Sequence, residues 1–176
     1  MANKDTTVFR GSDAILSLNP DTSISSDVNS EEAKIAGPYI TDFNLFPSVG
    51  RATNVEIYVQ TELELFHEIG VRFPTALRPG NINISGKIGR AYINGALITM
   101  LLGKGVVFPH EKEPYPQPSF MLSVDIKDPA FPDVISTLRI YGVKFDDWAF
   151  SLPEDDFVME SVTFKGLTIS VEDGKS

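Results

Sequence analysis

The sequence of 176 residues contains no cysteine and only two histidines, and these shortages limit its chemistry. Without cysteine there is no disulfide framework, no thiolate nucleophile and no thiolate metal site. The histidines, His67 and His110, fall in different predicted elements. His67 opens the sequence His-Glu-Ile-Gly, but position 71 is valine where a zincin motif needs its second histidine. We therefore interpret His67 as an ordinary residue at the polar edge of a strand.

Long apolar runs and an excess of basic residues are lacking too. ALITMLL, one of the longest apolar stretches, is far shorter than the roughly 20 residues of a bilayer-spanning helix. The N-terminus, MANKDTTVFRGSD, lacks the apolar core of a signal peptide. A net charge of −9 argues against a surface built to grip phosphates. We expect a soluble protein, made and kept in a cytoplasm, with no membrane segment.

Candidate catalytic groups were sought among the acidic clusters and the glycines. Asp146-Asp147 and Glu154-Asp155-Asp156 lack the alternating oxygen ligands and the closing glutamate of a calcium loop, which favours solvated turns. Gly86-Lys87 is not followed by the Ser or Thr of a phosphate-binding loop. The sequence therefore predicts no catalytic residue, no metal site and no cofactor, and it indicates that the protein is not an enzyme.

What the sequence does contain is a regular alternation of apolar and polar residues, which is typical of strands with one buried face. The longest such run is 54–66. It predicts an apolar face packed against a helix or a second sheet, formed by Val55, Ile57, Val59, Leu63 and Leu65. The opposite face is predicted to face solvent, with Glu56, Gln60, Glu62 and Glu64.

Further strands and one short helix are predicted along the chain. Strand candidates cover 6–10, 13–18, 34–46, 82–92, 119–127, 134–151 (bent near Gly142 or Asp147) and 157–172. Arg78-Pro79-Gly80-Asn81 predicts a turn. After Asn94, a candidate N-cap, the apolar spacing becomes helical, and Gly103 is a candidate C′ residue. The helical positions are Leu97, Ile98, Leu101 and Leu102.

These elements predict a single domain over 1–176, all-β with one short α-helix, as a β-sandwich or barrel-like subunit. Residues 1–12 are expected to form an N-terminal arm. Two long polar loops are expected at 19–33 and 104–118, the second with four prolines that disfavour regular structure. Trp148 is interpreted as a core anchor.

Parts of the chain resemble the tail tube (inner tube) proteins of tailed bacteriophages, over 54–103 and 119–172. The likeness rests on an Ile-Gly-x-Arg-x-Pro step from Ile69 to Pro74 and on a strand ending Gly-x-Ile-x-Arg-Ala at Gly86–Ala91. It also includes the Asn-Gly start of the helix and a closing strand pair joined by Pro-x-Asp-Asp-Phe. These motifs are compositional rather than catalytic.

The resemblance implies six subunits in a ring, whose inner sheets join edge to edge, and rings stacked into a tube that conducts DNA without binding it specifically. It implies a place in the virion tail after assembly in the host cytoplasm, with tail sheath and tape-measure or baseplate proteins as partners. The acidic face of 54–66 would then line the lumen. Candidate ring-stacking residues lie in the arm and the first polar loop: Asp5, Thr6, Phe9, Asp21, Ser25, Asp27 and Glu31.

Other interpretations stay open. The chain could be a tube or tube-initiator protein of another contractile injection system, which differs in its assembly partners rather than its fold. A monomeric β-sandwich that binds a carbohydrate would use exposed aromatic residues, for which Tyr58, Phe66 and Tyr92 are the candidates. A β-sandwich hydrolase would need a carboxylate pair in a cleft, and the sequence offers no clear one. The acidic face of 54–66 could also lie on an ordinary outer surface.

Overall fold

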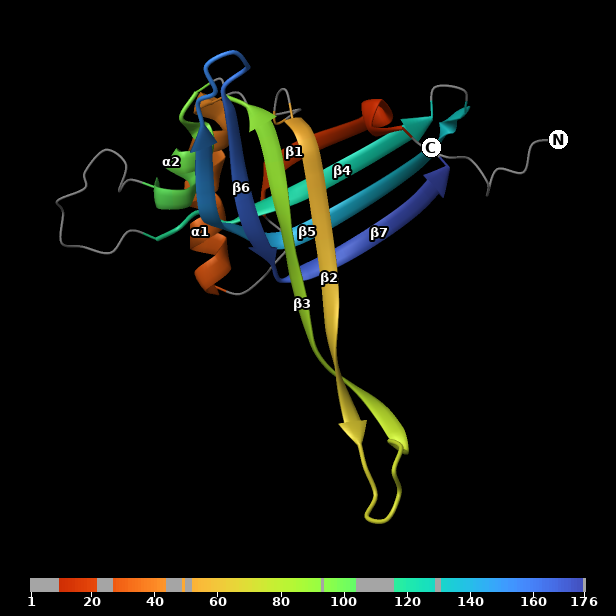
Figure 1. Ribbon diagram of the computed structural model, residues 1–176. Coiled ribbons are helices and arrows are strands. Elements are labelled where there is room, and N and C mark those ends of the chain that lie inside the picture. The colour runs from red at the N-terminus through yellow and green to blue at the C-terminus, as the bar shows by residue number, and fades with distance from the viewer. Residues whose placement is uncertain are drawn as a thin grey trace.

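The computed structural model describes residues 10–21, 27–43, 49, 52–92, 94–103, 116–128 and 131–175. Within these residues the chain forms seven strands, two α-helices and one short 3-10 turn, Gly11–Asp13 (Figure 1). The strands are β1 (Ala14–Pro20), β2 (Ala52–Phe66), β3 (Ala76–Ala91), β4 (Phe120–Asp128), β5 (Phe131–Ser151), β6 (Met159–Gly166) and β7 (Thr168–Lys175). The helices are α1 (Asp27–Asp42) and α2 (Ala96–Leu102). The mostly-β prediction is confirmed.

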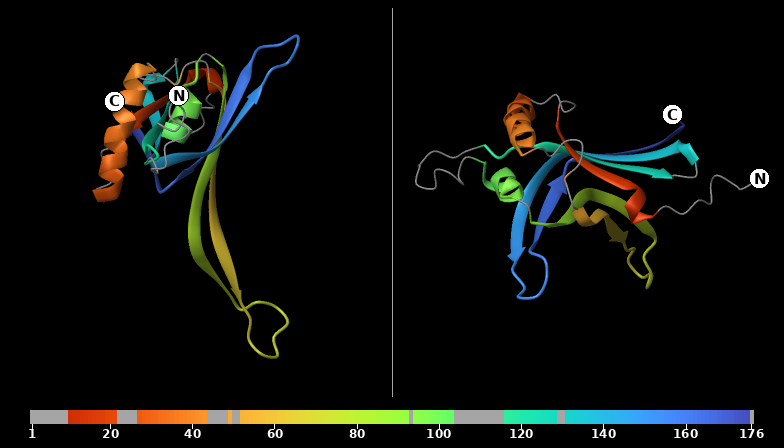
Figure 2. Two further views of the ribbon diagram at one scale, coloured as in Figure 1. Left: turned by 90° about the vertical axis from the view of Figure 1, so that its left-hand side faces the viewer. Right: turned by 90° about the horizontal axis from the view of Figure 1, so that it is seen from above.

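All strands belong to one antiparallel sheet, in the order β1-β4-β5-β6-β3-β2, with β7 paired to β5. The first part of β5 pairs with β4 and β7, whereas its last part, from Lys144 to Ser151, pairs with β6. The long strand β5 therefore connects two halves of the sheet, which diverge in Figure 2. The sheet is bent across itself and is not a closed barrel.

The bend in β5 lies at Gly142, as the sequence predicted. Gly142 has a φ of 64°, which strongly favours glycine, and an added Cβ would lie 2.5 Å from Leu167 Cδ1. The Gly142 N–H donates to Asp21 Oδ2 over 2.6 Å, so the bend is also held by a buried carboxylate. A register shift between Phe145 and Asp147 follows, which accounts for the second predicted position of the bend.

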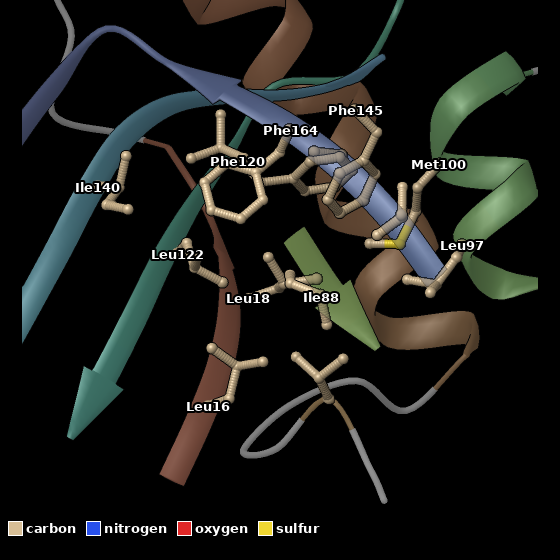
Figure 3. Packing of buried hydrophobic residues seen from close by; sticks show 14 of the residues in the cluster. Leu16, Leu18, Ile88, Leu97, Met100, Phe120, Leu122, Ile140, Phe145 and Phe164 are labelled. Carbon is tan, nitrogen blue, oxygen red and sulfur yellow. The ribbon is translucent and has the colours of Figure 1, made fainter. Parts of the chain in front are cut away.

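The hydrophobic core fills the angle between the two halves of the sheet and extends under α2 (Figure 3). Phe120 and Phe145 stack there with ring centroids 5.6 Å apart. Trp148 packs against this cluster, as predicted. The labelled core residues come from five strands (β1, β3, β4, β5 and β6) and from α2: Leu16, Leu18, Ile88, Leu97, Met100, Phe120, Leu122, Ile140, Phe145 and Phe164.

Helix α1 corrects two predictions, the polar loop at 19–33 and the strand at 34–46. Residues 19 and 20 end β1, and the helix begins at Asp27 and continues to Asp42 through Pro38. Its apolar residues Ala36, Tyr39 and Ile40, with Phe43 directly after its end, follow the i, i+3, i+4, i+7 spacing of one helix face. Ala36 and Ile40 are buried. The Gly37-Pro38 pair concealed this helical period in the sequence.

The turn predicted at 78–81 is also wrong, because these residues lie inside β3. The register with β2 shifts here, between Thr61 and Leu63, and this irregularity accommodates Pro79-Gly80. At this level β3 pairs only with β2, since its pairing with β6 begins at Ile84. A proline without an N–H is tolerated on such an edge. The chain reverses instead between Phe66 and Ala76, where Gly70 has a φ of 86°.

Helix α2 matches its prediction closely. It covers Ala96–Leu102, but its N-cap is Gly95 rather than the predicted Asn94. The Asn94 side chain lies one residue earlier, and its Oδ1 accepts a hydrogen bond from the Ala96 N–H over 3.3 Å. Gly103, with a φ of 58°, ends it. Leu97 is fully buried, Ile98 and Leu101 are half-buried, and Leu102 is 50% exposed, so the helix buries one face only. Residues 116–119 of the predicted loop 104–118 have no regular structure, and the rest of that loop lies outside the described residues.

Candidate assembly surfaces

Strands β2 and β3 continue beyond the rest of the sheet as a two-stranded arm (Figure 1). We define the arm as residues 59–83, and its tip as residues 67–75, between the two strands. Near the body, Val55 and Ile57 pack against the core as predicted. On the arm the predicted burial is wrong, because no element among the described residues covers its apolar side chains. The exposed fractions are 50% for Val59, 62% for Leu63 and 58% for Leu65.

The arm is apolar at its tip as well. Ile69 is fully exposed and Phe73 is 76% exposed, and Val71 between them is exposed too. The Ile-Gly-x-Arg-x-Pro step that contributed to the family resemblance therefore forms the tip of the arm. Large exposed apolar patches on a soluble domain mark interaction surfaces. The sequence singled out Ile69–Pro74 only as part of the family resemblance and gave no indication that these residues form a projecting surface.

The glutamates predicted to face solvent share one face of β2 with polar and basic neighbours. Glu56 accepts hydrogen bonds from Tyr58 Oη over 2.5 Å and from Asn54 Nδ2 over 2.8 Å. These two donors, together with the positive charge of Lys87, hold the pKa of the Glu56 carboxyl below its ordinary value. The Tyr58 hydroxyl, bonded to that carboxylate, has a raised pKa.

The same face continues along the arm with its charges interleaved. Glu64 stands opposite Arg78 in the register of β2 and β3, and Glu56 stands opposite Lys87. Glu62 Oε2 accepts a hydrogen bond from Asn81 Nδ2 over 3.3 Å. Gln60 is exposed on the same stretch. The face that carries the three glutamates is therefore weakly acidic and hydrogen-bonded, since two cations oppose them across the strand pair.

Two edges of the sheet half formed by β5, β6, β3 and β2 carry no partner strand within the described residues. The outer edge of β2 is one, because β2 pairs only with β3. The other is the last part of β5, residues 146–151, which pairs only with β6. Unpaired N–H and C=O groups along such edges readily bind another strand. Both edges are thus free, among the described residues, to pair with a further strand.

A buried ion pair fixes the junction between this sheet half and α2. Arg90 Nε donates to Glu160 Oε1 over 2.6 Å, and both side chains are almost fully buried. Trp148 Nε1 donates to Glu160 Oε2 over 3.0 Å, and Arg90 Nη2 donates to Asn94 Oδ1 over 3.2 Å. This network connects β3, β5 and β6 to Asn94, just before α2. The sequence pattern placed Arg90 in the strand-ending motif but did not identify its partner, which is 70 residues away.

The structure describes three of the seven predicted ring-stacking residues. Asp21 is 3% exposed and bonded to Gly142, so its carboxylate is engaged inside its own subunit. Asp27 and Glu31 lie in α1 rather than in a loop. The remaining four lie outside the described residues: Asp5, Thr6, Phe9 and Ser25.

The structure also places the residues of the alternative interpretations. All three aromatic candidates for a carbohydrate site are exposed, at 49% for Tyr58, 54% for Phe66 and 40% for Tyr92. Across the described ranges, no group of three or more His, Cys, Asp or Glu side chains is placed to hold a metal ion. Of the aromatic candidates for a carbohydrate site, Tyr92 packs edge-on against Phe150 with ring centroids 5.0 Å apart, and Tyr58 is bonded to Glu56. None of the helices in the described part of the chain has the length and apolar character needed to cross a membrane.

No family model and no curated protein matches the sequence. Among solved structures, the SPP1 tail tube matches with a TM-score of 0.57 at 12% identity, over 96% of this chain and 81% of that one. A chain of the sheath-tube complex of an extracellular contractile injection system (PVC) matches at 0.52 and 10%, over 96% and 93%. A chain of the six-fold symmetrised baseplate of the anti-feeding prophage matches at 0.51 and 10%, over 70% and 79%. The chain thus has the fold of phage tail tube proteins and of contractile injection system tube components.

Proposed function

We propose that this protein is the structural subunit of a phage tail tube, forming hexameric rings that stack into a hollow conduit for DNA. The observation that carries the proposal is the four-stranded sheet half with both edges free. Because its four strands are antiparallel, the two edge strands run in opposite directions. Rotation of a copy about an axis outside the sheet then places the β2 edge beside residues 146–151 of a neighbour, again antiparallel. A closed ring leaves no edge exposed.

The structural neighbours support six subunits per ring and the identity of the partner proteins. One similar chain comes from a six-fold symmetrised baseplate and another from a sheath-tube complex. By analogy with these assemblies, we infer that tail sheath, baseplate and tape-measure proteins are the partners, that the virion tail is the location and that assembly takes place in the host cytoplasm. A structural role of this kind requires no catalysis, so the proposal includes no enzymatic activity.

The lumen is proposed to be lined by the face with Glu56, Gln60, Glu62 and Glu64. Val55 and Ile57, on the opposite face, pack toward the core, so the glutamates are directed away from the body of the subunit. Water in the bore screens charges over a Debye length of about 8 Å, so repulsion acts near the wall. Lys87 and Arg78 reduce the net charge, and a weakly acidic, hydrated wall gives DNA little to adhere to.

The lumen proposal is tested by changing Glu56, Glu62 and Glu64 together to Lys. Glu62 and Glu64 are exposed and Glu56 is only partly buried, so the subunit should tolerate the change, and rings and tubes should still form in micrographs. DNA delivery by the assembled particles should slow or stall, because the wall would then attract phosphates. A tube reconstruction with these side chains on its outer surface would contradict the assignment.

The N-terminal arm, residues 1–12, is proposed to bridge rings. Its first nine residues lie outside the described part of the chain, and their composition buries little apolar surface, so a partner must offset the cost of ordering them. Deletion of residues 1–8 should leave a folded subunit that forms few or short tubes. Tubes of undiminished length would show that the N-terminal arm does not contribute to ring stacking.

Negative-stain microscopy of the purified protein tests the proposed function as a whole. Rings and hollow tubes are expected as concentration rises, together with a large species in size-exclusion chromatography. A strictly monomeric protein at high concentration would contradict the proposal and favour a ligand-binding module. The second candidate, a tube or tube-initiator protein of another contractile injection system, is favoured by the match to the sheath-tube complex. Co-purification with sheath rather than with DNA-filled particles would support it.

A further inference from the structure

An apolar groove lies between β1 and the start of β2, at the opposite end of β2 from the arm tip. Its volume is about 630 Å³, which is comparable to that of a small-molecule binding pocket. Most of its lining is aliphatic, including Ala14, Leu16, Val55, Ile57 and Val124. Ile15, also in the lining, is 46% exposed. The groove is open because β1 pairs only with β4 and β2 only with β3.

The most exposed apolar side chain that the structure describes is Ile69, at the tip of the arm. With Phe73 it forms an apolar projection that the subunit does not cover. The apolar tip cannot pack into the apolar groove of its own subunit, because the two lie at opposite ends of β2. They can do so between two copies, head to tail.

Strand β2 sets the distance between these two surfaces. It starts at the groove with Ala52 and ends beside the tip with Phe66, and 15 residues in an extended conformation cover about 45–50 Å. A second copy displaced along β2 by about this length, or less where the strand is tilted, brings its tip to the groove of the first. Such a contact does not close on itself, so it generates an open stack.

Charge also favours this pairing. Arg72 lies between Ile69 and Phe73 on the tip and has no ion pair or hydrogen bond in the described part of the chain. Asp13 lies between two residues that line the groove, Gly11 and Ala14. The guanidinium of one copy would therefore approach a carboxylate beside the groove of the next.

We propose that the groove between β1 and β2 is the receptor for the arm tip of a second copy in the adjacent ring. Ile69 and Phe73 enter the groove, and Arg72 lies over Asp13. The inference rests on the proposed tube function and names the surfaces that would make its axial contact. It assigns the groove to neither residues 1–9 nor a ligand from outside the assembly.

The lack of native cysteine makes thiol cross-linking a clean test. The double variant I69C/I15C is assembled into tubes and treated with a short bismaleimide, then denatured and separated by size. A ladder of dimers, trimers and longer oligomers is expected, because each subunit has one reactive tip and one reactive groove. Each single variant should give no ladder. The matched control is I69C/L152C, whose second thiol lies in the exposed β5–β6 loop instead.

The outcomes separate the inference from the proposed function. Tubes without a ladder for I69C/I15C, or a ladder only for I69C/L152C, would overturn the groove as receptor while the tube function stands. Absence of rings and tubes from the unmodified protein would contradict the function itself and the inference with it. In the short tubes expected of a variant lacking residues 1–8, the same cross-link should persist, and a ladder that appears only in that variant would assign the groove of the full chain to the N-terminal arm. Phe73→Glu should yield separate rings, and undiminished tubes would also count against the inference.

Discussion

The two ends of the β2–β3 pair have the same kind of alternating sequence and opposite burial. In the body, Ile84 and Ile88 of β3 are 6% and 0% exposed. On the arm, Ile82 of the same strand is 65% exposed, and Leu63 opposite this region of β3 is 62% exposed. The alternation is continuous across the boundary. The alternation shows that one face of the strand pair is apolar. Only the fold shows whether that face is buried within the subunit or is left for another copy to bury.

The buried ion pair in the body should give the largest effect. Glu160→Ala removes the partner of Arg90 and leaves a guanidinium buried, which should lower the free energy of unfolding by about 3–5 kcal/mol. Chemical denaturation of the unassembled subunit measures it. The control is Asp146→Ala, which breaks the exposed pair with Lys165 and should cost at most about 1 kcal/mol. Equal losses in the two variants would mean that burial does not distinguish these pairs.

Truncation of leucine compares body and arm directly. Leu97→Ala, in the core under α2, should lower the free energy of unfolding by about 2–5 kcal/mol. Leu63→Ala, on the arm, should change it by no more than about 0.5 kcal/mol, because the side chain is already in water. Denaturation curves for both variants are the measurement. A cost at Leu63 as large as at Leu97 would show that the arm is covered within the subunit.

Substitution of two glycines of β3 should give a smaller difference in stability. A Cβ at Gly86 would lie 2.3 Å from Phe164 Cζ and 2.4 Å from the Glu56 carbonyl oxygen, so Gly86→Ala should destabilise the subunit by about 1–3 kcal/mol. At Gly89 the nearest atom, Thr53 Oγ1, is 3.6 Å away, so Gly89→Ala should be nearly neutral. Thermal unfolding of the pair decides the matter. Similar melting temperatures would refute the close approach at Gly86.

The smallest effect concerns the titration of Glu56. The hydrogen bond from Tyr58 is the main cause of the lowered pKa of Glu56, so Tyr58→Phe should raise this pKa toward the ordinary value. Because the folded-state pKa is the lower one, the linked stability is present above the unfolded pKa and is lost as pH falls through the folded pKa. Carboxyl NMR titration of the free subunit follows the shift. An unchanged midpoint in Tyr58→Phe would remove the hydrogen bond as the cause.

The sequence was sufficient for elements whose period is local. Helix α2, with Asn94 before it and Gly103 after it, was identified from residue types alone, and the bend in β5 was narrowed to Gly142 or Asp147. Helix α1 was missed because Gly37-Pro38 outweighed the spacing of Ala36 and Ile40. Residue types indicate conformations that are locally favourable, whereas packing of a helix face onto β1 overrides them.

The candidate surfaces were less predictable because they depend on contacts distant in sequence. The partner of Arg90 is Glu160, and strand alternation gives no information about which of many acidic residues reaches it. Pro79-Gly80 indicated a turn, but a register irregularity in a two-stranded arm accommodates the same residues. The exposed tip followed from neither pattern nor composition, since it depends on how far β2 and β3 extend beyond β6.

A cryo-EM reconstruction of tubes grown from the purified protein tests the central claim most directly. We predict six-fold rings in which the β2 edge of each subunit pairs antiparallel with residues 146–151 of its neighbour, with an axial repeat of no more than about 50 Å, the length of β2. Rings joined through other strands, or a protein that yields only monomers under every condition, would contradict the account.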